Sequence, residues 1–203
     1  MASTATIRHM PDPFYSKLHR AIRFATKQHK GQDRDGTAPL PYVTHPIDVV
    51  VRLRYIGQVL DEEILCAGAL HDVVEECGVD PEKIEKKFGR RVRTLVEELT
   101  RDELTPQERE KLTEVEVWEE RTRRMLKEIR EEMSADARVV KLADRLSNLS
   151  EALLTRTGIK RDRYVAQTTL ILEAIPRETN AALWDAVQAV VHSVPTVLPG
   201  EIS

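Results

Sequence analysis

The sequence predicts an all-α fold in a single domain. Apolar residues recur at helical spacing through most of the chain. Helix-start signals, in which a capping residue precedes a proline, stand at Asp12-Pro13, Asp80-Pro81 and Thr105-Pro106. No pair of alternating segments that would form a β-hairpin is present, and a length of 203 residues suits one core.

The helices are expected in the following order. The first begins at Asp12-Pro13 and buries a stripe formed by Phe14, Leu18, Ala21, Ile22 and Ala25. After a Gly- and Pro-containing loop over 31–41, the others cover a segment from His45-Pro46 to Ile56, then 61–76, 81–88, 90–99, 106–133, 134–154, 160–175 and 179–192. The segment over 106–133 is rich in charged residues and is expected to form one long, mostly solvated helix. The expected domain spans 12–194, between a flexible leader over 1–11 and a frayed tail over 195–203.

Composition narrows the function classes. The formal net charge is -3, from 31 basic against 34 acidic residues, and aromatic residues make up 4%. A general nucleic-acid binder would usually be basic, and a single-strand binder would use stacking aromatics. No apolar run approaches the roughly 20 residues of a membrane span, and the first ten residues lack the apolar core of a signal peptide. The prediction is a cytoplasmic protein with no nucleic-acid or membrane partner, and the sequence carries no signal of oligomeric state.

The two cysteines, Cys66 and Cys77, lack the spacing of zinc ligands. The interpretation is a small buried residue and a residue at a helix end, both reduced.

An ionisable pair, His71-Asp72, interrupts the apolar segment LCAGALHDVV. A buried carboxylate needs a partner, so the pair predicts either a hydrogen bond within the core or a metal site. On this pair alone the two interpretations are equally supported. Glu75 and Glu76 follow at helical spacing on the same face, and acids gathered in this way repel one another without a cation. Glu76 could equally end the helix in solvent.

Two further residues complete a possible ligand set. His45 opens a helix in PYVTHP, where a histidine alone is more often a cap. Asp144 lies in the apolar segment VVKLADRLSNL, where it could simply pair with Lys141 or Arg145. Taken together, two imidazoles and two carboxylates suit manganese, iron or another borderline first-row ion. Four protein ligands leave positions for water and a phosphate oxygen, as metal-assisted hydrolysis requires.

The motifs HKGQ, PYVTHP, ALHDVVEE, FGRRVRTLVEELT and VVKLADRLSNL occur in this order. From about Phe14 to about Thr168 the sequence resembles the hydrolase domain of RelA/SpoT-type enzymes, and most closely the stand-alone small alarmone hydrolases of the stringent response. The resemblance implies a helical HD-domain bundle over 12–194 that binds one manganese ion. It implies hydrolysis of ppGpp or pppGpp at the 3′-pyrophosphate, giving GDP or GTP and pyrophosphate.

The resemblance also assigns roles to individual residues. It implies metal ligands at His45, His71, Asp72 and Asp144. It implies that Glu75 and Glu76 position or activate the attacking water. We predict that Glu75 assists the metal-bound water and that Glu76 supports Glu75 or protonates the leaving group. It implies substrate contacts from Arg34, packed on the guanine, from Asn148 and from the basic residue Arg163.

Three positions depart from the family pattern. Arg34 is followed by Asp35 where a lysine is usual, the acidic pair is Glu75-Glu76 in place of Glu-Asp, and TAPLPY lacks a common glycine. Asp35 reverses a charge near a polyanionic substrate. It therefore favours an alternative, a phosphohydrolase of another nucleotide such as a nucleoside monophosphate or the 2′-phosphate of NADPH. A catalytically silent binding module is disfavoured because every ligand and both acids are present.

Overall fold

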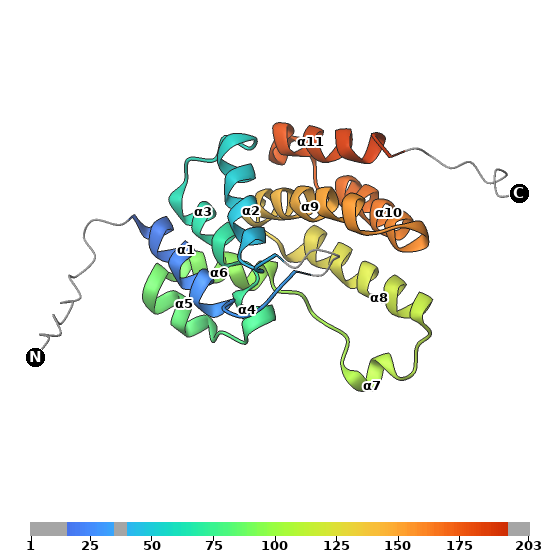
Figure 1. The fold of residues 1–203 in the computed structure, drawn as a ribbon, viewed down its shortest axis with the longest axis horizontal. Coiled ribbons are helices and arrows are strands. Elements are labelled where there is room, and N and C mark those ends of the chain that lie inside the picture. Colours follow the sequence, from blue (N-terminus) through green and yellow to red (C-terminus); the bar gives the residue numbers. More distant parts are fainter. Residues whose placement is uncertain (1–15, 35–39, 195–203) are drawn as a thin grey trace, which may run out of the picture.

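A computed structural model describes residues 16–34 and 40–194 of the chain. All of the regular elements in this part are helical, and an isolated bridge joins Asp33 to Pro41 (Figure 1). The all-α prediction is therefore confirmed. None of the helices in the described ranges has the length and apolarity needed to cross a membrane.

The elements follow the predicted order with a few differences. They are α1 Lys17–Gln28, α2 Thr44–Tyr55, α3 Glu62–Leu70, α4 Val73–Cys77, α5 Pro81–Phe88, α6 Arg90–Leu99, α7 Pro106–Arg109, α8 Glu114–Lys127, the π-helix η1 Glu128–Glu132, α9 Ala135–Thr155, α10 Gly158–Ala174, the 3₁₀-helix η2 Arg177–Thr179 and α11 Ala181–His192.

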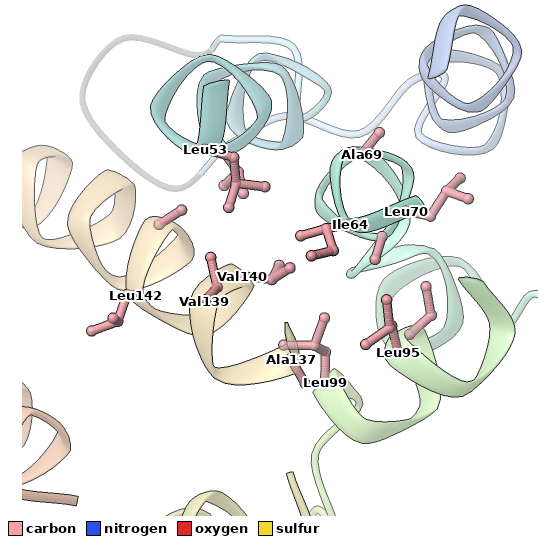
Figure 2. Close-up of a cluster of buried hydrophobic side chains, with 14 of the residues drawn as sticks. Leu53, Ile64, Ala69, Leu70, Leu95, Leu99, Ala137, Val139, Val140 and Leu142 are labelled. Atoms are coloured by element: carbon pink, nitrogen blue, oxygen red, sulfur yellow. The ribbon is translucent and has the colours of Figure 1, made fainter. Parts of the chain in front are cut away.

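Two helices form the centre of the molecule. The helix α3 packs against α1, α2, α6 and α9, while α9 also packs against α2, α10 and α11. Every residue of α3 from Ile64 to Leu70 is buried, and the side chains of Leu53, Leu95 and Val140 meet it in the core (Figure 2). Burial of apolar surface on all sides explains why this helix carries no polar stripe.

A glycine brings α2 close to α3. A Cβ atom added at Gly68 would lie 2.5 Å from Leu53 Cδ1, a separation that real Cβ atoms do not show. The absence of a side chain at Gly68 therefore lets α2 approach the end of α3. His45 lies on α2 and His71 directly follows α3, so this approach also brings the two imidazoles together.

The sequence predicted one helix over 61–76, and this prediction was wrong. It breaks at His71-Asp72 into α3 and α4. The carbonyl of Gly68, which a continuous helix would offer to the amide of Asp72, accepts a hydrogen bond from the ring of His71 at 2.9 Å. Asp72 takes φ -95° and ψ -7°, at the edge of the helical region, and becomes the N-cap position of α4.

The prediction of a single helix over 106–133 was also wrong, because the structure divides this segment into α7, α8 and η1. The helix start at Thr105-Pro106 is present, as predicted, and Thr105 forms a capping box with Glu108, but it opens only the four-residue helix α7. A second capping box then starts α8. The side chain of Thr113 accepts a hydrogen bond from the amide of Glu116, and the Glu116 carboxylate accepts one from the amide of Thr113. The prediction that this stretch is mostly solvated agrees with α8, in which Thr122 and Met125 are the buried residues.

The first helix begins at Lys17, with the side chain of Ser16 capping it. The predicted start at Asp12-Pro13, the core position Phe14, the leader over 1–11 and the tail over 195–203 lie outside the described residues. The leader, the tail and the domain limits therefore stay predictions. Cys66 is buried and Cys77 is half-buried at the end of α4, and both are free thiols, as expected.

Leu53→Ala is expected to destabilise the protein by roughly 2–5 kcal/mol, because it leaves a cavity between α2 and α3. Leu53 is fully buried, whereas Leu154 is 88% exposed and serves as the matched control. Leu154→Ala is expected to change the free energy of unfolding by less than about 0.5 kcal/mol. Urea unfolding followed by circular dichroism measures both. Equal stabilities of the two variants would show that Leu53 does not hold α2 on α3.

Candidate metal centre and nucleotide cavity

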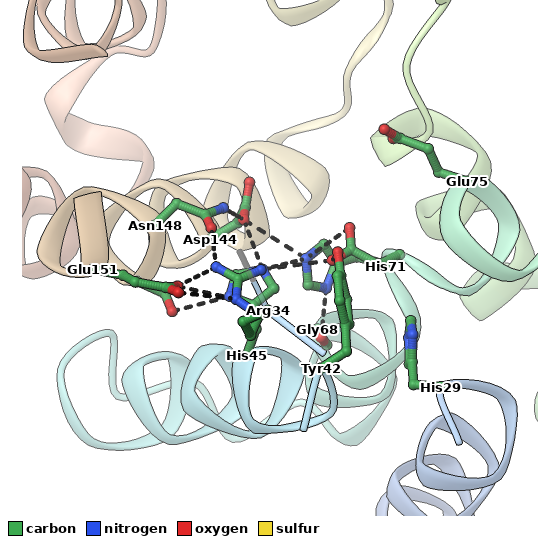
Figure 3. Close-up of polar contacts among 12 residues, drawn as sticks. His29, Arg34, Tyr42, His45, Gly68, His71, Glu75, Asp144, Asn148 and Glu151 are labelled. Atoms are coloured by element: carbon green, nitrogen blue, oxygen red, sulfur yellow. Dashed lines mark hydrogen bonds and ion pairs between the residues drawn. The ribbon is translucent and has the colours of Figure 1, made fainter. Parts of the chain in front are cut away.

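Four ligand-type atoms from three parts of the chain converge at one point. His45 Nε2 lies 3.2 Å from His71 Nε2 and 3.2 Å from Asp144 Oδ1. His71 Nε2 lies 3.2 Å from Asp72 Oδ1 and 3.6 Å from Asp144 Oδ1. His45, His71 and Asp72 form a cluster able to hold a metal ion, and Asp144 adjoins it. All four predicted ligands are thus brought together (Figure 3).

The separations fit a metal centre. Ligand atoms at about 2.0–2.2 Å from a metal, with neighbouring bonds near a right angle, lie about 3 Å apart. The tautomer of His71 also fits, because its Nδ1–H donates to the carbonyl of Gly68 and leaves Nε2 with its lone pair toward the cluster. Nδ1 of His45 contacts Ser147 Oγ at 3.1 Å. Both rings are therefore oriented by their outer nitrogen atoms.

The carboxylates have partners as well. The hydroxyl of Tyr42 donates to Asp72 Oδ2 at 2.8 Å. Asp144 accepts from Lys141 Nζ at 3.2 Å and from the amide of Asn148. The pairing of Asp144 with Lys141, one of the simpler interpretations of the sequence, does occur. It occurs together with the imidazole contacts and does not replace them.

The cluster attracts positive charge. Burial alone would lower the pKa of His71, but the carboxylates of Asp72 and Asp144 and the carbonyl of Gly68 outweigh burial and raise it to about 9. Burial would raise the pKa of Asp144, yet Lys141 and the two imidazoles hold it well below its usual range. A site that favours a proton on a buried imidazole this strongly also favours a metal cation.

The cluster opens into a cavity of about 1260 Å³ that is lined by α4, α8, α9 and α10 and by the segment around Arg34. This volume exceeds the roughly 300–1,000 Å³ of typical small-molecule pockets. The other predicted site residues all line the same cavity: Arg34, Glu75, Glu76, Asn148 and Arg163.

The two acids have different surroundings. The carboxylate of Glu75 is ion-paired with Arg101, and Arg101 Nε donates to it at 3.2 Å. Glu76 has no ion pair among the described residues, and burial together with the charges of Asp72 and Glu75 raises its pKa. Figure 3 shows Glu75 at a distance from the imidazoles, on the far side of the His71 loop.

Arg34 lies over the ring of Tyr42, with its guanidinium carbon 5.3 Å from the ring centre. Its NH2 group donates to Asn148 Oδ1 at 2.9 Å, and its Nε and NH2 bind Glu151. Arg163 also lines the cavity, and its guanidinium carbon lies 5.8 Å from the ring centre of Trp118. Asp35, which the sequence comparison singled out, lies outside the described residues.

Sequence reasoning missed several of these partners. Tyr42 stands in the motif PYVTHP, three residues before His45, but nothing in the sequence shows that its hydroxyl reaches Asp72. Glu151 was not considered, although it lies seven residues after Asp144 and hence on the same face of α9. That spacing was the signal available. The sequence carries no comparable signal for the pairing of Arg101 with Glu75, because the two residues belong to separate segments.

Residues 21–172 match the protein family described as HD domain, which is more than half of the chain. This chain belongs to the HD-domain family. The paired His71-Asp72, with His45 and Asp144 around it, lies within the matched range and occupies the metal centre.

Several relatives similar to this HD-domain protein carry the name MESH1 and are described as guanosine-3′,5′-bis(diphosphate) 3′-pyrophosphohydrolases. The protein of Xenopus tropicalis is 37% identical over 131 residues, covering 64% of this chain and 66% of the relative. That of Drosophila melanogaster is 34% identical over 173 residues, covering 83% and 89%. A solved structure of a metazoan SpoT orthologue, described as hydrolysing ppGpp, has a TM-score of 0.74 at 30% identity and covers 88% of this chain and 95% of its own.

Asp144→Ala and the isosteric Asp144→Asn are expected to lose tightly held metal, because each removes a carboxylate from the ligand cluster. Metal content after dialysis, measured by mass spectrometry, checks this. Asp136→Ala is the matched control, since Asp136 lies on the same helix but pairs with the exposed Arg91. If both Asp144 variants keep full metal occupancy while folding normally, Asp144 is not a ligand.

Proposed function

We propose that this protein is a metal-dependent phosphohydrolase that removes the 3′-pyrophosphate from ppGpp or pppGpp, giving GDP or GTP and pyrophosphate. The observation that carries the proposal is the His45, His71, Asp72 and Asp144 cluster, which forms one wall of a cavity large enough for a nucleotide. The MESH1 relatives, described as 3′-pyrophosphohydrolases of this substrate, support the choice of reaction.

The four clustered residues would hold one divalent ion, with Asp144 as the fourth ligand. When bound, such an ion supplies Lewis acidity and lowers the pKa of water. We take manganese as the metal, because two imidazoles and two carboxylates suit a borderline first-row ion. Tyr42, Lys141 and Ser147 would keep the ligands in place, since each contacts one ligand side chain.

The two acids would divide the proton transfers. Glu75 would orient the attacking water and accept its proton, and its ion pair with Arg101 would hold the carboxylate in place. Glu76 would support Glu75 or protonate the leaving pyrophosphate. A raised pKa suits that second role, because a carboxyl that holds its proton can donate it.

The purine base would stack on Arg34, whose guanidinium is flat and already lies over Tyr42. Asn148 would lie beside the base, between Arg34 and the metal centre. Arg163, which lines the same cavity, would bind phosphate. This arrangement suits a substrate with a base at one end and phosphate groups beyond the ribose.

A second nucleotide class stays open because of Asp35, which stands where a lysine is usual. A less charged substrate, such as a nucleoside monophosphate or the 2′-phosphate of NADPH, would be less disfavoured by that carboxylate.

The cytoplasmic location of the protein also stays a prediction.

The deciding experiment is a release assay with the manganese-loaded full chain. Pyrophosphate release from ppGpp, with GDP as the second product, is the expected result. Nucleoside monophosphates and NADPH are tested in parallel for phosphate release. Turnover of NADPH or a monophosphate without release of pyrophosphate from ppGpp would reject the alarmone assignment and favour the second class.

Glu75→Gln is expected to keep the metal and to lower kcat by about 10²–10⁴-fold, the usual contribution of a general acid or base. The amide keeps the shape and a hydrogen bond to Arg101 but cannot accept a proton. Metal content and kcat are measured on the same preparation. Glu97→Gln is the control, because Glu97 also binds an arginine, Arg93, but lies outside the cavity. Near-normal turnover by Glu75→Gln would remove Glu75 from the mechanism.

A further inference from the structure

Glu151 binds the one arginine that the proposed function assigns to the nucleobase. Its carboxylate accepts from Arg34 Nε at 3.0 and 3.3 Å, and from Arg34 NH2 as well. The Arg34 side chain is 15% exposed and the Glu151 side chain 31%, so the pair is only partly screened by water. The two residues lie 117 positions apart, so this contact joins the loop before α2 to α9 (Figure 3).

The same guanidinium is connected to the metal centre by two routes. Arg34 NH2 donates to Asn148 Oδ1 at 2.9 Å, and the amide of Asn148 in turn donates to Asp144. Arg34 also lies over Tyr42, whose hydroxyl donates to Asp72 at 2.8 Å. The residues Asp144, Asn148 and Glu151 are spaced by four and three positions, which places them on one face of α9.

We propose that Glu151 is a positioning residue that fixes the guanidinium of Arg34 over the ring of Tyr42, so that the nucleobase meets a preformed stacking surface. This inference rests on the proposed function, because it assumes a base at Arg34. Without Glu151, the long arginine side chain would have to lose its rotational freedom each time a nucleotide binds.

The contacts also decide what Arg34 can bind. Phosphate recognition by arginine uses two parallel N–H groups on one edge of the guanidinium. Here the edge formed by Nε and NH2 is taken by Glu151 and Asn148, and the carboxylate neutralises the positive charge. The guanidinium carbon lies 5.3 Å from the centre of the Tyr42 ring. With that edge occupied and the charge paired, Arg34 suits stacking with a flat ring better than binding of a phosphate.

A double-mutant cycle with the manganese-loaded full chain tests the proposal. Arg34→Ala, Glu151→Ala and the double variant are compared with the wild type for hydrolysis of ppGpp. Glu151→Ala is expected to raise KM about tenfold and to leave kcat within about twofold, because ordering of Arg34 affects binding of the base. The double variant is expected to match Arg34→Ala alone, because Glu151 acts only through Arg34.

Two further variants separate positioning from a general loss of stability. Glu151→Asp keeps the carboxylate, so its KM is expected to lie between those of the wild type and Glu151→Ala. If the position were merely structural, the aspartate and alanine variants would not differ in KM in this way. Glu97→Ala removes an acid that binds Arg93 Nε at 3.1 and 3.2 Å outside the cavity, and it is expected to leave KM unchanged. Additive effects of Arg34→Ala and Glu151→Ala, or a fall in kcat with unchanged KM, would overturn the proposal.

A nucleotide-free measurement keeps this inference separate from the proposed function. In ¹H–¹⁵N spectra of the full chain loaded with diamagnetic zinc, the Nε–H signal of Arg34 is expected to be sharp and slowly exchanging. It is expected to disappear in Glu151→Ala. An identical signal in both proteins would overturn the role of Glu151. Absence of ppGpp hydrolysis by the wild type would instead reject the proposed function. The spectroscopic test of the Glu151–Arg34 contact would remain valid, because it uses no nucleotide.

Discussion

Two imidazoles and two carboxylates meet within 3.2–3.6 Å in the interior of this protein, and the surrounding structure is arranged around that contact. Polar groups at such separations in a protein interior are costly unless each has a partner. Gly68 lets α2 approach α3, the break at His71-Asp72 turns both side chains toward the same point, and α9 supplies Asp144. Lys141, Asn148, Tyr42, Ser147 and the carbonyl of Gly68 also form hydrogen bonds with these four side chains.

In the proposed function, the cavity beyond the cluster has two ends that share the helix α9. Asp144 belongs to the proposed metal end, Glu151 to the end where Arg34 lies, and Asn148 is hydrogen-bonded to both Asp144 and Arg34. A rigid helix therefore sets the distance between the proposed base and the proposed reacting phosphate. This is the type of support that catalytic geometry requires, because small displacements of a bound substrate cost large factors in rate.

The acidic pair shows how neighbouring residues of the same type obtain different properties. Glu75 is bound to Arg101 from the segment after α6, whereas Glu76 faces the charges of Asp72 and Glu75 with no ion pair among the described residues. The ion pair therefore fixes the position of the Glu75 carboxylate, whereas burial and the two neighbouring carboxylates raise the pKa of Glu76. The proposed division of proton acceptance and proton donation is consistent with these different surroundings.

The sequence by itself determined the helical fold and the approximate order of the helices, because helical periodicity is a local signal. The clustered residues were singled out by combining several motifs with the family resemblance, since each residue alone had a simpler interpretation. It could not determine where a helix breaks. The division of 61–76 at His71-Asp72 depends on a side chain that bonds to Gly68, and that of 106–133 on a second cap at Thr113. The partners of the site residues were decided only by the tertiary structure. Arg34 and Glu151, or Glu75 and Arg101, are brought together by packing of helices distant in the chain, and such contacts leave no periodic pattern in the sequence.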